Sequence, residues 1–302
     1  MLNTKLITVL IIILKSISCL AQDSLKNDLK DMELKGRIKS IRQNVYTVDE
    51  DKLPDIQKGE RDFKFNIYQN YTIFFDDKGN KTEETHCNIN YLYEGFKPYD
   101  TVFYYRTIYT YNDKGNLKEA DEYKSNNYKT DGILDNRMIY KYNENDKWDE
   151  YHIYNADSTL SGEGFCEYDG KNVIREIAYY IDMNFHSETF NKYDDSGNII
   201  ETNSCSYYTN GDTTCSKCIN KYDPAGEKIE EHSSSWFGIV DVLYKYDNNG
   251  NIIEEFFKGE TGAEDIVNTY EYKYDAEGNW TEKREYKNRV PKYIFERKIV
   301  YY

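Results

Sequence analysis

Apolar and polar residues alternate in short stretches along most of this chain. Val240, Val242, Tyr244 and Tyr246 would share one face of an extended strand, and charged residues such as Asp241 and Lys245 lie between them. The same alternation recurs in Tyr105, Thr107, Tyr109 and Tyr111 and in Tyr270, Tyr272 and Tyr274. A period of two with one apolar face is typical of half-buried antiparallel strands.

These predicted strands run into one recurring turn. The template Y-x-Y-[DN]-x-x-G-N-x-x-E fits residues 109–119, 244–254 and 272–282, and with small changes residues 73–83, 191–201 and 220–230. Weaker copies lie at residues 140–150 and around Tyr168. Asp or Asn at the first turn position and Gly at the fourth indicate a type I turn, with Gly in the left-handed conformation. Each copy therefore predicts a β-hairpin.

The repeats organise most of the chain. Eight copies are marked by an anchor aromatic, and residues 299–302 would begin a ninth; the anchors are Phe75, Tyr111, Tyr142, Tyr168, Tyr193, Tyr222, Tyr246 and Tyr274. One hairpin cannot bury its own aromatic face, whereas stacked hairpins can. We expect an all-β domain over residues 34–302, in which stacked antiparallel β-hairpin repeats form a curled single sheet. Its tyrosines would face inward with hydrogen-bonded hydroxyls.

The first 21 residues predict a secretory signal peptide. Lys5 precedes an apolar run from Leu6 to Leu14 that is too short for a permanent membrane span. Cleavage after Ala21 would release a soluble protein, whereas lipoprotein processing would anchor it at Cys19. Ser16 stands where a lipobox usually carries Leu, which favours the first alternative. We expect an exported protein in the periplasm, on the outer-membrane surface or secreted.

Residues 22–33 form a linker or a short helix, because Leu25, Leu29 and Met32 have helical spacing. Residues 34–46 alternate as a strand and are expected to cap the sheet. We see no transmembrane segment after signal removal.

Composition limits the partners. Aromatic residues make up 16 % of the chain, including 32 Tyr, which argues for a folded protein despite its high charge. Without Lys5 and Lys15 of the signal peptide, 37 basic residues face 54 acidic ones, a net charge of −17. Such a charge repels phosphate backbones and anionic lipid headgroups, so nucleic acid is excluded as a partner.

The motif Y-x-Y-D-x-x-G resembles the YD repeat of RHS-type proteins over about residues 70–302. The resemblance implies hairpins wound into a β-shell. This chain has Gly-Asn where many YD repeats have Gly-Arg, and it lacks both a self-cleaving acidic motif and a C-terminal toxin domain, so toxin delivery is not carried over. A carbohydrate-binding role, suggested for some YD proteins, is what the resemblance implies for function. Short exported chains of this kind are similar to Bacteroidetes proteins.

The cysteines suggest a disulfide. Cys205 and Cys215 flank the turn signal Asn210-Gly211, and a three-residue loop would place them opposite each other. We expect Cys205 to pair with Cys215 or Cys218, as exported proteins can keep disulfides. A redox Cys215-x-x-Cys218 would need a βαβ context that is absent. A zinc site of these three cysteines with His232 is a further alternative.

Other chemistry receives little support from the sequence. Asp-rich turns such as Asp247-Asn248-Asn249-Gly250 could suggest calcium, but an EF-hand needs Gly at the sixth position, and turn chemistry already explains the Asp. The chain carries no G-x-S-x-G, P-loop or H-E-x-x-H motif. We therefore predict no cofactor, no metal and no enzymatic activity.

The expected function is a binding or scaffold module for glycan or a cell-envelope protein. Its ligand-binding candidates are aromatic residues outside the template: Tyr91, Tyr93, Phe96, Tyr99, Trp236 and Phe237. They lie in segments that read as loops, where binding functions concentrate. The alternative is a glycan-acting hydrolase that uses two carboxylates in the groove of the curled sheet.

Overall fold

The computed structural model describes residues 28–48, 56–61, 70–91, 100–126, 131–236, 238–259 and 264–302. Apart from the single turn α2 (Asp28–Asp31) and the 3₁₀ turn η2 (Ile181–Met183), its regular elements are strands. The strands are β1 (Ile38–Val48), β2 (Lys58–Arg61), β3 (Tyr71–Phe75), β4 (Lys81–Tyr91), β5 (Asp100–Tyr111), β6 (Leu117–Ser125), β7 (Ile133–Tyr142), β8 (Trp148–Asn155), β9 (Leu160–Asp169), β10 (Asn172–Tyr180), β11 (Phe185–Tyr193), β12 (Ile199–Tyr208), β13 (Thr213–Tyr222), β14 (Lys228–Ser235), β15 (Gly238–Tyr246), β16 (Ile252–Lys258), β17 (Ile266–Tyr274), β18 (Trp280–Lys287) and β19 (Val290–Tyr301). The all-β class predicted from the sequence is confirmed.

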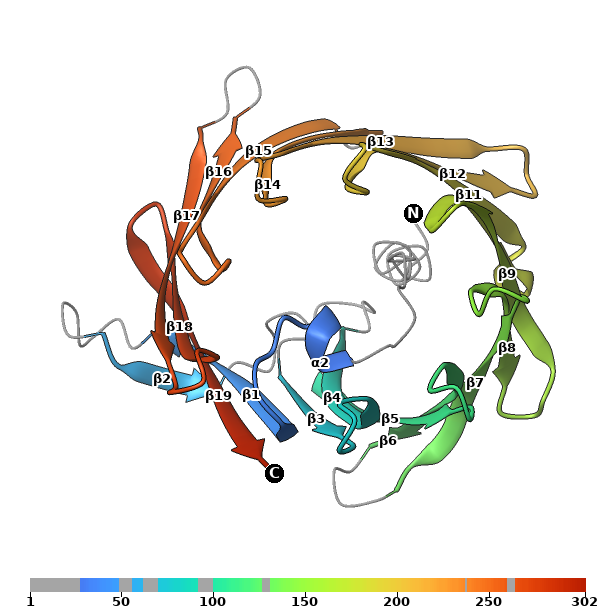
Figure 1. Cartoon of the computed structure of the whole chain (residues 1–302), viewed down its shortest axis with the longest axis horizontal. Coiled ribbons are helices and arrows are strands. Elements are labelled where there is room, and N and C mark those ends of the chain that lie inside the picture. Colours follow the sequence, from blue (N-terminus) through green and yellow to red (C-terminus); the bar gives the residue numbers. More distant parts are fainter. Residues whose placement is uncertain are drawn as a thin grey trace.

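The sheet closes into a barrel, as Figure 1 shows. From β3 to β19 each strand pairs antiparallel with the next along the chain. β1 lies between the two ends of this series, with Ile41 opposite both Ile299 of β19 and Ile73 of β3. In the described part of the chain, β1 and β3–β19 thus form a closed ring of eighteen strands, while β2 pairs only beside the end of β1.

The predicted curled open sheet is therefore wrong in one respect, because the sheet has no free ends. β19 is the first strand of a ninth hairpin, and β1 supplies its missing second strand. The segment expected to cap the sheet closes it instead. A closed barrel satisfies the strand edges that a curled strip would leave exposed.

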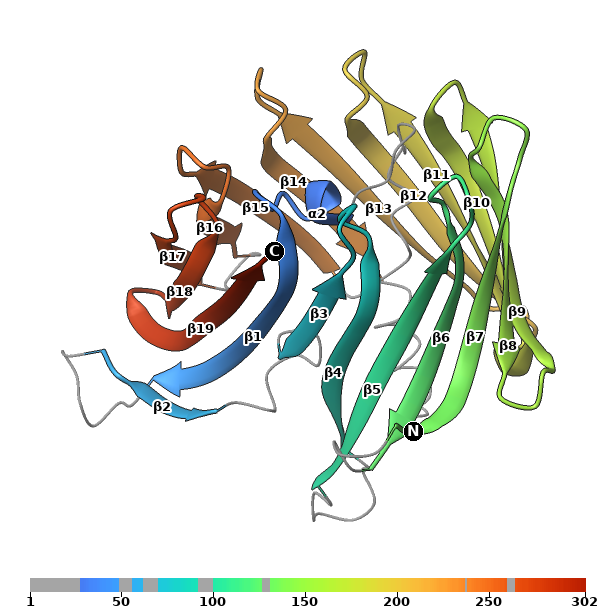
Figure 2. The same cartoon turned by 60° about the horizontal axis from the view of Figure 1, so that its bottom comes forward.

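The inner face of the barrel is identified by α2, which lies within the ring (Figures 1 and 2). Leu29 of α2 packs against Ile41, Ile73 and Phe75, so this face of β1 and β3 points inward. Directly paired residues of neighbouring strands share a face. Followed from strand to strand, this rule places the anchor tyrosines on the inner face, where the Tyr111 hydroxyl donates to the Asp28 carboxylate at 2.9 Å.

The anchor tyrosines lock each hairpin to the preceding one. The Tyr142 hydroxyl donates to the backbone carbonyl of Leu117, the first residue of the strand after the previous turn, at 2.7 Å. The same bond recurs between Tyr111 and Lys81, Tyr168 and Trp148, Tyr193 and Val173, Tyr222 and Ile199, and Tyr246 and Lys228. In the last copy Tyr272, two residues before the anchor, makes it with Ile252. These buried hydroxyls therefore serve the sheet itself rather than a ligand.

The register changes by two residues near the C-terminus. Glu201 of β12 pairs with Ile219, which lies three residues before the anchor Tyr222. Glu254 of β16 pairs with Thr269, which lies five residues before the anchor Tyr274. The shift moves the anchor Tyr274 away from the backbone carbonyl, and its hydroxyl donates to the Asp247 carboxylate of the preceding turn instead.

The recurrent polar residues of the template have structural partners. In the first turn, Asp76 Oδ1 accepts the backbone N–H groups of Lys78 and Asn80, both at 2.9 Å, and Gly79 has a φ of 89°. The template Glu residues lie on the outer wall and pair with a cation of the neighbouring strand: Arg106–Glu83, Arg137–Glu119, Lys141–Glu150, Lys192–Glu201, Lys221–Glu230, Lys245–Glu254 and Lys273–Glu282. Among the described residues, no helix has the length and apolar character needed to cross a bilayer.

Candidate functional site

A groove of 380 Å³ lies at the rim opposite the template turns, where β10 and β12 end and β11 begins. Its lining is mainly aromatic and consists of Tyr179, Tyr180, Ile181, Asn184, Phe185, His186, Tyr207, Tyr208 and Thr209. The connection through η2 turns sharply, with Asn184 in the left-handed conformation at a φ of 53°. We call this the rim groove.

The groove is built from two columns of stacked rings. On the inner face, Phe185 stacks between Tyr180 and Tyr208, with ring centroids 4.5 and 5.4 Å apart. On the outer face, His186 stacks between Tyr179 and Tyr207 at 5.5 and 4.8 Å. Direct cross-strand pairing produces both columns, because it sets Cβ atoms about 5 Å apart. Thr213 follows Tyr207 in the outer row and carries no ring, so that column ends at Tyr207.

Sequence reasoning missed these residues because it searched loops rather than strand ends. The signal was present as the doublets Tyr179-Tyr180 and Tyr207-Tyr208. Consecutive residues of a strand point to opposite faces, so an aromatic doublet places one ring on each side of the wall. Two such doublets on β10 and β12, with Phe185-His186 between them on β11, predict two columns.

The ligand-binding candidates from the sequence are not brought together. Trp236 lies in the connection between β14 and β15, at the same rim as the groove but not in its lining, and is 56 % exposed. Tyr91 is the last residue of β4, and its side chain lies outside the described part. Tyr93, Phe96, Tyr99 and Phe237 also lie outside it, as do the signal peptide and Cys19.

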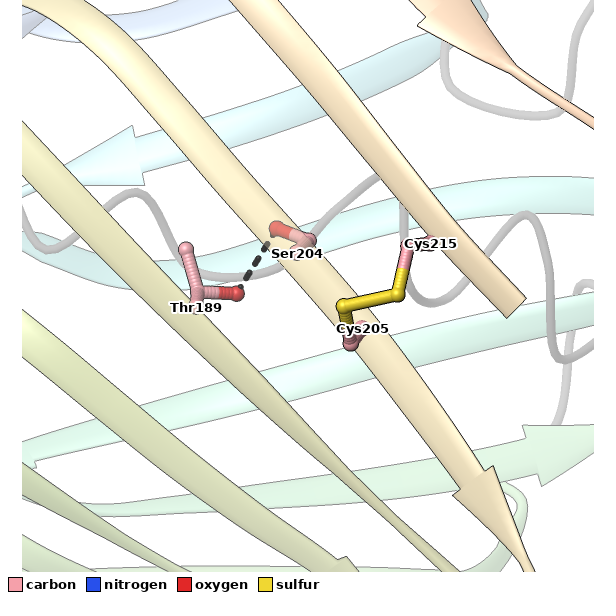
Figure 3. Close-up of a disulfide and its surroundings, with 4 residues drawn as sticks. All are labelled: Thr189, Ser204, Cys205 and Cys215. Carbon is pink, nitrogen blue, oxygen red and sulfur yellow. Dashed lines mark hydrogen bonds between the residues drawn. A yellow bond between two sulfur atoms is a disulfide. The ribbon is translucent and has the colours of Figure 1, made fainter. Parts of the chain in front are cut away.

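A disulfide joins Cys205 of β12 to Cys215 of β13 on the outer wall (Figure 3). The two residues are directly paired. The backbone N–H of Tyr208 donates to the carbonyl of Asp212, so the loop that closes the hairpin consists of Thr209, Asn210 and Gly211. The residue before Cys205, Ser204, points to the inner face and hydrogen-bonds Thr189 of β11 at 2.9 Å (Figure 3).

The alternative partner, Cys218, keeps a free thiol. It lies three residues after Cys215 and therefore points to the inner face, opposite Thr202. The alternative zinc site is wrong because its four ligands do not lie on one face. Cys218 points to the inner face, whereas His232 lies on the outer wall with its Nδ1 2.5 Å from Asp241 Oδ1. Among the described residues, no three His, Cys, Asp or Glu side chains converge as a metal site requires.

Reduction of the disulfide should lower the free energy of unfolding by about 2–3 kcal/mol, as expected for a short loop. Urea unfolding with and without reductant measures the effect, and Cys205→Ser should reproduce it. Cys218→Ser serves as the control and should leave the effect of reductant unchanged. Peptide mapping without reduction that links Cys218 to either partner would contradict the assignment.

Two groups of inner-wall carboxylates bear on catalysis. Burial raises the pKa of Glu176 to about 7, but its direct cross-strand neighbours are Cys166 and Thr189, and neither is a second carboxylate. Glu255 accepts the Tyr270 hydroxyl at 2.6 Å, and Glu285 pairs directly with Tyr270. Burial raises the pKa of Glu285, and the negative charge of Glu255 adds to the shift. Glu255 and Glu285, which both adjoin Tyr270, are the pair to test for a hydrolase.

Comparison with known proteins yields neighbours in structure only. No family model matches the chain, and no curated protein matches it. A crystal structure of a porin-like protein from Bacteroides uniformis is similar with 9 % identity and a TM-score of 0.42, and the match covers 88 % of this chain and 98 % of that one. The TcdB2-TccC3 structure is similar with 12 % identity and a TM-score of 0.31, over 82 % of this chain and 16 % of that one. The Photorhabdus luminescens Tc holotoxin pore is similar with 11 % identity and a TM-score of 0.19, over 71 % and 15 %. The likeness to YD repeats therefore rests on the sequence motif.

Proposed function

We propose that this chain is an exported, non-enzymatic binding module that holds a neutral glycan in the rim groove. The observation that carries the proposal is the pair of aromatic columns on a closed barrel. Sugar rings present C–H faces that stack on aromatic side chains. Tyrosine hydroxyls, His186 and Asn184 supply the hydrogen-bonding groups that fix orientation in such sites.

The charge of the chain supports a neutral ligand. The net charge of −15 repels polyanions, while an uncharged polysaccharide pays no such penalty. The Lys–Glu pairs on the outer wall also support a barrel that works in water, because charges that face lipid are costly. We place the protein outside the inner membrane: in the periplasm, on the outer-membrane surface or secreted.

The rigid frame suits this function. Rings fixed by cross-strand stacking lose little side-chain entropy when a ligand binds, which lowers the cost of association. The groove needs no change in the barrel wall to accept a sugar, since its lining consists of strand ends and two tight turns.

Tyr207→Ala should weaken glycan binding at least about tenfold, which corresponds to about 1.4 kcal/mol. This is the loss expected for truncating one aromatic anchor of a site. A glycan array finds the ligand, and calorimetry on the best hit measures the variant. Tyr286→Ala is the matched control, since Tyr286 lies on the outer wall away from the groove. Equal glycan binding by the native protein and Tyr207→Ala would show that the rim groove is not the binding site.

A turnover assay on the same polysaccharides tests the hydrolase alternative. The non-enzymatic proposal expects binding without product. Product formation that Glu285→Gln or Glu255→Gln abolishes would replace the proposal by hydrolysis on the inner wall, because these two carboxylates flank Tyr270.

A further inference from the structure

A second surface on the outer wall lies between the rim groove and the template turns. Phe165 of β9 pairs directly with Ile177 of β10, and Phe190 of β11 lies opposite Arg175 of β10. Phe165 and Phe190 are 37 % and 44 % exposed. We call Phe165, Ile177 and Phe190 the outer patch. Apolar side chains that adjoin one another on a water-facing wall mark an interaction surface, whereas scattered ones do not.

Carboxylates border this patch. Glu188 of β11 pairs directly with Ile177, and Glu167 lies two residues beyond Phe165 on the same face of β9. The side chain of Glu167 is 56 % exposed. The cation within the patch is Arg175, which forms ion pairs with both Glu167 and Glu188 at 2.8 and 3.3 Å and lies over the Phe190 ring. Its charge is therefore already compensated. Lys192, two residues beyond Phe190 on the same face, is paired with Glu201 at 2.9 Å, so the border stays net acidic.

From this combination we infer that the outer patch docks a protein segment in which Lys or Arg stands beside aromatic or aliphatic side chains. Apolar side chains of the partner would cover Phe165 and Phe190, and its cations would meet Glu167 and Glu188. Complementary charge also steers association. A second copy of this chain fits poorly, because it would bring the same acidic border and a net charge of −15. The inference does not rest on the glycan proposal, since the patch residues do not line the groove, although Phe165 meets the groove residue Tyr179 edge-on at 6.3 Å between ring centroids.

The test uses a synthetic amphipathic Leu/Lys peptide and its Leu/Glu counterpart as probes, measured by fluorescence anisotropy on the full chain. We expect the Leu/Lys peptide to bind and the Leu/Glu peptide not to bind. The double variant Phe165→Ser/Phe190→Ser should lose at least about tenfold in affinity, the equivalent of about 1.4 kcal/mol. Glu167→Gln should weaken binding and reduce its dependence on salt.

Leu243→Ser is the matched control, since Leu243 is 49 % exposed and lies on the outer wall of β15, away from the patch. It should bind the Leu/Lys peptide like the native protein. Undiminished binding by the double variant would overturn the inference, because the peptide would then follow overall charge. Equal loss in Leu243→Ser would also overturn it, because the peptide would then not distinguish the patch from other exposed apolar side chains. Circular dichroism confirms that each variant is folded, and Tyr207→Ala should affect glycan binding alone.

Discussion

Ile41→Ala should lower the free energy of unfolding by about 3–4 kcal/mol, the upper part of the range for truncating a buried aliphatic side chain. Ile41 has no exposed surface, and it is the point where β1 meets both ends of the strand series. The cavity left by the change would lie among Leu29, Ile73 and Phe75, so it would loosen α2 as well as the wall.

Urea unfolding measures the loss, and Arg42→Ala is the control because Arg42 is the exposed neighbour on the outer face of β1. The control should change stability by no more than about 0.5 kcal/mol. Amide hydrogen exchange adds a sharper readout, since opening of the seam exposes backbone groups on both sides. Exchange should accelerate in β3 and in β19 together. Acceleration in one of them alone would mean that β1 pairs with a single edge and that the sheet is open.

Gly164→Ala should destabilise the protein by about 3 kcal/mol, at the upper end of the cost of overpacking a core. A Cβ atom at Gly164 would lie 2.3 Å from the Tyr151 ring. That ring cannot easily move, because Tyr151 is buried and packs with Trp148, Cys166 and Val173. Steric contact at this distance would force either the ring or strand β9 out of place.

A double-mutant cycle separates this clash from other effects. Tyr151→Leu removes the ring, so Gly164→Ala should cost much less in the Tyr151→Leu background, with a coupling of about 1–3 kcal/mol. Thermal or urea unfolding of the four proteins supplies the cycle. Additive effects of the two changes would show that Gly164 is constrained by something other than the ring of Tyr151.

The hairpins could be predicted because their signals are local. Asp247, Gly250 and the tyrosines before them lie within a few residues of one another, and they fix turn, strand and face together. The disulfide was also within reach, because the register of one hairpin decides it. The sequence left Cys215 and Cys218 open as partners of Cys205, and the structure pairs Cys205 with Cys215 because Cys218 lies on the other face of β13.

Closure and the groove could not be predicted in the same way. β1 lies far from β19 in the sequence, and the pattern of residues 34–46 does not indicate which strand will pair with β1. The rim groove lies at strand ends opposite the template turns, so the repeats do not point to it, and its signal is confined to the doublets Tyr179-Tyr180 and Tyr207-Tyr208. The two-residue register shift before Tyr274 could not be predicted either. The template around Tyr274 is complete, and the shift lies in the pairing of β16 with β17.

The joining of β1 to β19 also determines when the barrel can form. In chain order β1 is the first of the eighteen wall strands and β19 is the last, so all the other hairpins can assemble while the seam is still open. Until β19 is available, the second edge of β1 and the outer edge of β18 remain unpaired, and such edges can recruit strands from another chain. Long-range pairing of this kind is slow. Closure is therefore the step of folding at which this protein is most exposed to aggregation.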